Sequence, residues 1–147
     1  MTEDVLVGIR GLHTLTGEEE AVDDIEVIFP GSARLLGDTW YVQYSEPVEG
    51  TGGEIRSLIK IREHHMEVTK RGLANTHMVF EEGKKTTTWY ETPMGSISLG
   101  ITATDVTVTQ GENSLTARAV YALDVNSQYM TDCAIQINVS ERDQVTI

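Results

Sequence analysis

The sequence has few residues that would cross-link or stiffen the chain, and no segment that would place it in a membrane. It contains one cysteine, so a disulfide within the chain is impossible, and only three prolines among 147 residues. No apolar run approaches the roughly 20 residues of a membrane helix. The N-terminus, MTEDVLVGIRGLHTL, has neither the basic start nor the long apolar run of a signal peptide. We therefore expect a cytoplasmic protein without membrane association, folded as one domain over residues 1–147.

Positive charge is also scarce. Eleven Lys and Arg residues oppose 23 Asp and Glu residues, which gives a formal net charge of −12. A field of this sign repels phosphate backbones and anionic lipid surfaces, so nucleic acid is not an expected partner. The candidate basic clusters are scattered among acids: Arg56, Lys60 and Arg62; Lys70 and Arg71; Lys84 and Lys85.

Motifs of the common enzyme classes are missing as well. The sequence has no G-x-S-x-G, no G-x-x-x-x-G-K-[ST], no G-x-G-x-x-G and no H-E-x-x-H. His64 and His65 are adjacent, so they point to opposite faces of a strand or lie together at a surface turn, and do not readily pair as metal ligands. Cys133 alternates with isoleucines and reads as a small buried hydrophobe. We expect no metal and no cofactor.

Alternation of apolar and polar residues is what the sequence has in abundance, and this is typical of antiparallel β-strands. The alternating runs are residues 5–9, 25–29, 40–44, 55–61, 64–70, 78–80, 86–91, 97–108, 115–123 and 133–139. The pattern predicts an all-β fold, either a single antiparallel up-and-down barrel of about eight to ten strands or a two-sheet sandwich. Long strands favour the barrel because they can tilt and curve around it.

The sixth and seventh runs are expected to be antiparallel neighbours. Gly83 stands between them and is suited to the left-handed residue of a short hairpin loop. The seventh run, TTTWYETPMG (residues 86–95), ends at Pro93 and Gly95, which mark a strand end or a corner.

The centre of the chain resembles a known family. The matching residues are Arg71-Gly72, Thr76 to Gly83 and Tyr90 to Gly95, with Ile9 to Gly11, Gly17 to Glu20 and Trp40 to Glu46 outside the centre. They are similar to the YwiB-like family of small bacterial proteins of unknown function, up to about residue 110. The resemblance implies a calycin-type, lipocalin-like barrel in a cytoplasmic setting. It implies no activity.

The order Trp-Tyr-Glu at residues 89–91 is the most informative local feature for function. On a pleated strand Trp89 and Glu91 share one face, whereas Thr88 and Tyr90 share the other. Either register brings polar groups inside, as a carboxylate that needs a partner or as a hydroxyl-lined wall. Arg71 is the best-placed partner for Glu91, either as a tie that closes one end of the barrel or as a ligand contact.

Three hypotheses about function follow. The first is a binding module that takes a small, partly apolar ligand in the barrel interior. The second is a structural or protein-interaction module with a packed barrel, for example a homodimer. The third is an enzyme with Glu91 or Glu46 as general base and Arg71 as anion stabiliser, although we assign no catalytic residue. The candidate ligand contacts are Trp40, Tyr44, Glu46, Arg71, Trp89, Tyr90 and Glu91.

Overall fold

Ten antiparallel strands make up the described part of the protein. The structure is a computed structural model that describes residues 4–12 and 26–142. The strands are β1 (Asp4–Leu12), β2 (Glu26–Leu36), β3 (Thr39–Val48), β4 (Gly53–Arg62), β5 (His65–Gly72), β6 (Thr76–Glu81), β7 (Lys85–Thr92), β8 (Gly95–Gln110), β9 (Ser114–Val125) and β10 (Gln128–Glu141). Within these ranges no helix is long and apolar enough to cross a membrane.

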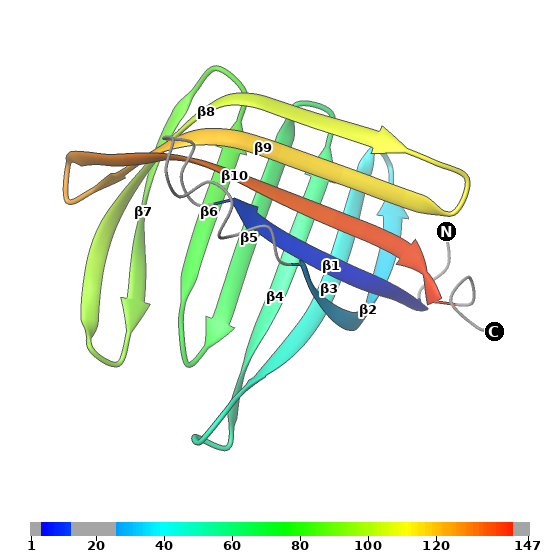
Figure 1. The fold of residues 1–147 in the computed structure, drawn as a ribbon, viewed down its shortest axis with the longest axis horizontal. Helices are drawn as coiled ribbons and strands as arrows, with labels where there is room; N and C mark the ends of the chain where they lie inside the picture. Colours follow the sequence, from blue (N-terminus) through cyan, green and yellow to red (C-terminus); the bar gives the residue numbers. More distant parts are fainter. Residues whose placement is uncertain (1–3, 13–25, 143–147) are drawn as a thin grey trace.

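The strands follow one another around a nearly closed barrel (Figure 1). Their order in the sheet is β6-β5-β4-β3-β2-β1-β10-β9-β8-β7, so strands that follow one another in sequence are paired, except β6 and β7, and β1 pairs with β10. Successive hairpins that curl until their ends meet are an up-and-down barrel, which confirms the predicted fold class. Of the residues used in the sequence analysis, His13, Gly17 to Glu20 and Ile25 lie outside the described residues.

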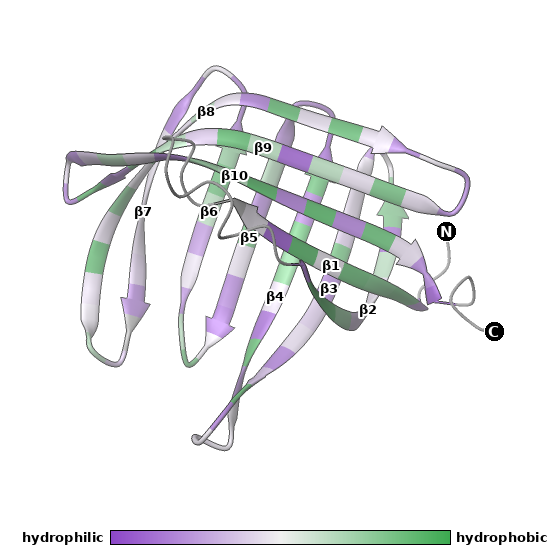
Figure 2. Ribbon diagram, in the orientation of Figure 1, coloured by the Kyte–Doolittle hydropathy of each residue, from purple (hydrophilic) through white to green (hydrophobic). Residues whose placement is uncertain are grey.

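Alternation decides which side chains enter the barrel. In β3 the side chains of Val42 and Tyr44 are buried whereas Gln43 is exposed, and in β4 Ile59 and Ile61 are fully buried. Figure 2 shows the same alternation of hydrophobic and hydrophilic residues along β9 and β10. The largest fully buried side chains belong to one hydrophobic cluster inside the barrel: Phe80, Ile59, Ile61, Met66, Ile101, Leu115, Ile137, Val5, Val7, Val42, Val106 and Val139.

The barrel has a seam between β6 and β7. Gly83 in the turn between them has a φ of 85°, which confirms the predicted left-handed residue. The two strands are antiparallel neighbours in space, as predicted, but among the described residues they form no hydrogen-bonded ladder and stand at opposite ends of the sheet order. They meet at an isolated bridge, Asn75 to Glu91, and through a 2.8 Å hydrogen bond from Thr86 Oγ1 to the carbonyl of Val79.

The two ends of the seam are fixed differently. At the turn, Gly83 N–H donates to the Ala103 carbonyl at 2.9 Å, and Ala103 N–H donates to the Lys84 carbonyl at 3.2 Å, which ties the turn to β8. At the other end Gly72 adopts a φ of 127°, and a Cβ there would collide with the Glu54 carbonyl oxygen. The Asn75 side chain hydrogen-bonds both the N–H and the carbonyl of Gly72 at 3.2 Å. This turn therefore positions Asn75 for its backbone bridge to Glu91.

Candidate functional site

A trough crosses the outer face of the barrel over β2 to β6. It has a volume of about 660 Å³, within the usual range for small-molecule sites. The residues that line it come from facing positions of five adjacent strands: Pro30, Gly31, Ser32, Gln43, Tyr44, Ser45, Arg56, Ser57, Leu58, Lys60, Thr69, Arg71 and His77. Strand alternation places most of these side chains outside the barrel, opposite to the buried cluster.

The trough is positively charged on a strongly acidic protein. Arg56, Lys60, Arg71 and His77 line it, and among the described lining residues none is Asp or Glu. The chain as a whole carries a formal charge of −12. Three of the eleven Lys and Arg residues, together with His77, therefore line this one hollow, which is an arrangement that favours a small anion there.

Arg56 and Arg71 form the centre of this charge. They are directly opposite each other in the β4–β5 ladder and share the outer face. Arg56 is 3.7 Å from Glu54 in an exposed contact, whereas the guanidinium of Arg71 makes no hydrogen bond or ion pair with any described residue. Like charges directly opposite across two strands are unfavourable. An anion that binds both guanidiniums would remove this repulsion and gain bidentate hydrogen bonds.

The floor and walls of the trough provide other contacts. Leu58 lies between Gln43 and Thr69 in the cross-strand row, so an apolar side chain sits among hydrogen-bonding groups. The Nζ of Lys60 is 5.6 Å from the centre of the Tyr41 ring, within cation–π range, which orients the ammonium over the neighbouring strand.

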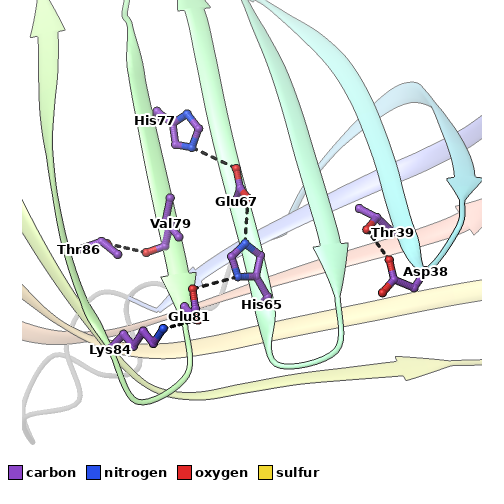
Figure 3. Close-up of polar contacts among 9 residues, drawn as sticks. All are labelled: Asp38, Thr39, His65, Glu67, His77, Val79, Glu81, Lys84 and Thr86. Carbon is purple, nitrogen blue, oxygen red and sulfur yellow. Dashed lines mark hydrogen bonds and ion pairs between the residues drawn. The ribbon is translucent and has the colours of Figure 1, made fainter.

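A chain of imidazoles and carboxylates holds His77 in place (Figure 3). Glu67 contacts His65 Nε2 at 2.9 Å through one carboxylate oxygen and His77 Nε2 at 3.1 Å through the other. His65 Nδ1 lies 3.5 Å from Glu81, which pairs with Lys84 at 3.1 Å. Burial alone raises the pKa of Glu67. The hydrogen bond from His65 and the charges of His65, His77 and Lys60 together outweigh it, so the pKa is lowered and Glu67 stays ionised.

A second hollow of about 340 Å³ lies across the seam. It shares Thr69, Arg71 and His77 with the trough, so the two hollows adjoin at these residues. On the β7 side its lining includes Trp89 and Glu91, both exposed.

The structure divides the predicted site residues between two faces. Arg71, Trp89 and Glu91 lie on the outer face and line the hollow at the seam together. Tyr90 shares the half-buried face of β7 with Thr86 and Thr88, so the register with Tyr90 inward is the one adopted. The seven candidates therefore do not form a single cluster.

The remaining candidates lie inside the barrel or at its mouth. Trp40 and Tyr44 are both buried members of the core cluster. The ring of Tyr44 stacks on Phe29 with 4.9 Å between centroids, and burial is the main reason that the pKa of the Tyr44 phenol is raised. Glu46 lies 3.9 Å from Lys70, whose side chain points to the inner face with Val68.

Arg56, Lys60 and His77 line the trough but were not among the site residues expected from the sequence. The position of Arg56 could have been predicted from the sequence. If β4 and β5 form a hairpin with Glu63 and His64 in its turn, residue-by-residue pairing along the two strands places Arg56 opposite Arg71. The histidines were weighed only as metal ligands. In the described part of the chain, no three His, Cys, Asp or Glu side chains are grouped so that they could hold a metal ion.

Comparison with known proteins agrees with the fold. A crystal structure of the ywiB protein from Bacillus subtilis superposes with a TM-score of 0.73 at 16% sequence identity, covering 95% of this chain and 92% of the other. No curated protein matches the sequence. The model of a domain of unknown function, DUF1934, matches residues 7–137. Since this match spans most of the sequence, the chain belongs to the DUF1934 family.

Proposed function

We propose that this protein is a binding module for a small anionic ligand, held in the trough on the outer face of β2 to β6. The observation that carries the proposal is the pair Arg56 and Arg71, opposite each other in a hollow whose described lining has no carboxylate. A phosphate or carboxylate between two guanidiniums gains charge-assisted hydrogen bonds and offsets a repulsion that the free protein carries.

The size and charge of the protein limit what this ligand is. The trough suits a compact ligand with one or two negative groups. A long polyanion would extend over the surrounding acidic surface and be repelled there. A small metabolite therefore fits better than a nucleic acid or a membrane, in agreement with the partners expected from composition.

The test is calorimetric titration with ribose 5-phosphate at low ionic strength, on the wild type and on single variants. Arg56→Gln and Arg71→Gln each remove one guanidinium. We expect each to weaken binding by about 1.5–3 kcal/mol, the usual value for a hydrogen bond to a charged group, or roughly tenfold to 100-fold. Arg62→Gln is the matched control, because Arg62 is exposed on the same strand but does not line the trough.

A second readout does not depend on the choice of ligand. If the arginines repel each other, Arg71→Gln stabilises the free protein against heat, and phosphate stabilises the wild type more than the variant. Absence of binding at millimolar ribose 5-phosphate, or an equal loss in Arg62→Gln, would refute the proposal.

A ligand inside the barrel, as first expected from the sequence, is a second candidate. The observation that favours it is Thr76, a buried residue whose Oγ1 has no hydrogen-bond partner among the described residues. Thr76 lies opposite Lys70 in the inner row. Native mass spectrometry of the purified protein tests this candidate: extra mass that survives desalting would support it, and the bare mass of the chain would count against it.

The two other hypotheses have less support. A general base at Glu91 would benefit from burial, but this side chain is exposed. The homodimer and the cytoplasmic setting remain predictions. The free edges at the seam are the feature of the described structure on which a second copy would pair.

A further inference from the structure

The hollow at the seam adds a different kind of surface to the trough. Trp89 lines it with 59% of its surface exposed. Single exposed apolar residues are common, and Tyr129 and Met130 at the far end of β9 and β10 are exposed to a similar extent. Trp89 differs from these two residues because it lines a hollow that adjoins a basic trough at Arg71 and His77. A flat ring could stack on it there.

The backbone beside Trp89 has unused hydrogen-bonding groups. Asn75 and Glu91 exchange two backbone hydrogen bonds of 2.9 Å, so alternate residues of β6 and β7 counted from this bridge face the seam. These include His77 and Trp89, which would be the next hydrogen-bonded pair of a continuous hairpin. No ladder joins β6 to β7 among the described residues, so the N–H and carbonyl groups of His77 and Trp89 are open to a ligand.

Glu91 makes the β7 side of the seam hollow unfavourable for anions, in contrast to the basic trough. Its backbone is fixed by the bridge to Asn75, and its exposed carboxylate lines the same hollow as Trp89. A carboxylate accepts hydrogen bonds from N–H donors and repels anions. The two adjoining hollows therefore differ in character, with cations at β4 and β5 and an aromatic ring with a hydrogen-bond acceptor at β7.

We propose that the ligand is of the nucleoside monophosphate type, with its anionic group between Arg56 and Arg71 and a flat, amino-bearing heterocycle against Trp89 at the seam. This inference rests on the proposed function and names its ligand class. The anion site lies on β4 and β5 and Trp89 lies on β7, so a linker such as a pentose is needed between the anion and the ring.

The experiment separates the two ends of the ligand. Adenosine 5′-monophosphate carries both groups, ribose 5-phosphate carries only the anion, and adenosine carries only the ring. The affinities of these three probes are measured by calorimetry for the wild type, Trp89→Ala, Trp89→Phe and the control Tyr129→Ala. Tyr129 is exposed to the same fraction as Trp89 but lies in the β9–β10 hairpin, away from both hollows.

We expect the wild type to bind adenosine 5′-monophosphate at least tenfold more tightly than ribose 5-phosphate. Trp89→Ala should abolish this difference without changing the affinity for ribose 5-phosphate, whereas Trp89→Phe should retain most of it and Tyr129→Ala all of it.

The contrary outcomes are distinct. Equal binding of the two phosphates by the wild type would overturn the inference and leave the anion site standing. A loss of ribose 5-phosphate binding in Trp89→Ala would also overturn it, because the tryptophan would then act on the trough and not on a ring. Failure of both phosphates to bind would remove the proposed function together with the inference.

Discussion

Asn75 and Glu91 exchange two backbone hydrogen bonds of 2.9 Å. They fix one end of the seam between β6 and β7, which has no backbone ladder among the described residues. The turn at Gly83 fixes the other end. Between them Thr86 Oγ1 donates to the Val79 carbonyl, where a continuous hairpin would use a backbone N–H. A side-chain hydroxyl thus links β6 and β7 where no ladder joins them among the described residues.

Removing this hydroxyl should loosen the seam. Thr86→Val keeps the shape of the side chain but leaves the Val79 carbonyl without its donor. We expect a loss of about 0.5–1.5 kcal/mol in the free energy of unfolding, measured by urea denaturation, and faster amide exchange in β6 and β7. Thr87→Val is the matched control, since Thr87 is exposed on the same strand. An equal effect of both substitutions would mean that the hydroxyl does not hold the seam.

The interior should respond to truncation far more than the outer face. Phe80 is fully buried and packs edge-on against Tyr121 with 4.9 Å between ring centroids. Phe80→Ala should cost about 3–5 kcal/mol through lost burial and a cavity. Trp89→Ala removes a larger ring from an exposed position and should change stability by less than about 0.5 kcal/mol. Comparable losses for the two variants would contradict the assignment of the inner and outer faces.

Glu67 should make stability depend on pH on the acidic side. Its pKa is lowered in the folded protein from an ordinary value of 4.5, so its ionised form stabilises the fold above that value. This stabilisation is lost as the pH falls through the folded pKa. Glu67→Gln should therefore be less stable than the wild type at neutral pH, and the difference should shrink as the pH falls below the ordinary value of 4.5 and through the lowered pKa of the folded protein.

Thermal unfolding as a function of pH measures this effect. Glu49→Gln serves as the control, because Glu49 is exposed and lies outside the chain of imidazoles and carboxylates. A stability difference for Glu67→Gln that is constant from neutral to acidic pH would contradict the role of its charge.

The thiol of Cys133 should react slowly with thiol reagents in the folded protein. Burial is the main cause that raises its pKa, and the charge of Asp132 acts in the same direction against a hydrogen bond with Tyr121. The reactive thiolate is therefore scarce at neutral pH and poorly accessible. We expect a thiol reagent to label the native protein much more slowly than the urea-unfolded protein. A cysteine introduced by Thr109→Cys, at an exposed position of β8, should react at the unfolded rate without denaturant. Equally rapid labelling of native Cys133 would show that the site opens readily.

Much of the barrel could be predicted from local pattern. The alternation around Val42 and Tyr44 and around Ile59 and Ile61 correctly identified the inner face, because a side chain's face depends only on its own strand. Gly83 identified the hairpin loop for the same local reason. The open seam could not be predicted from the sequence. Whether β6 and β7 form a hydrogen-bonded ladder depends on how the whole sheet curls, and residues 76–92 look like those of an ordinary hairpin.

The candidate site was harder to predict, because it depends on register between strands. Arg71 and Glu91 were singled out from the sequence and line the hollow at the seam, whereas Tyr44 and Trp40, expected to line a ligand cavity, are buried in the core. The sequence alone did not decide the face of β7, since Trp89 and Tyr90 are both large aromatic residues. The basic trough consists of residues that look scattered along the chain, and the curled sheet brings them together only through cross-strand pairs such as Arg56 with Arg71.

The pairing of β1 with β10 has a consequence for biosynthesis. β1 lies between β2 and β10, and its partner residues are separated in sequence by most of the chain, as with Val5 and Glu141. Until β10 has left the ribosome, both β1 and β9 expose an unpaired edge, and contacts at such long separation form slowly. We expect the growing chain to be most prone to aggregation just before its last described strand emerges, and chaperone binding at that stage to protect these two edges.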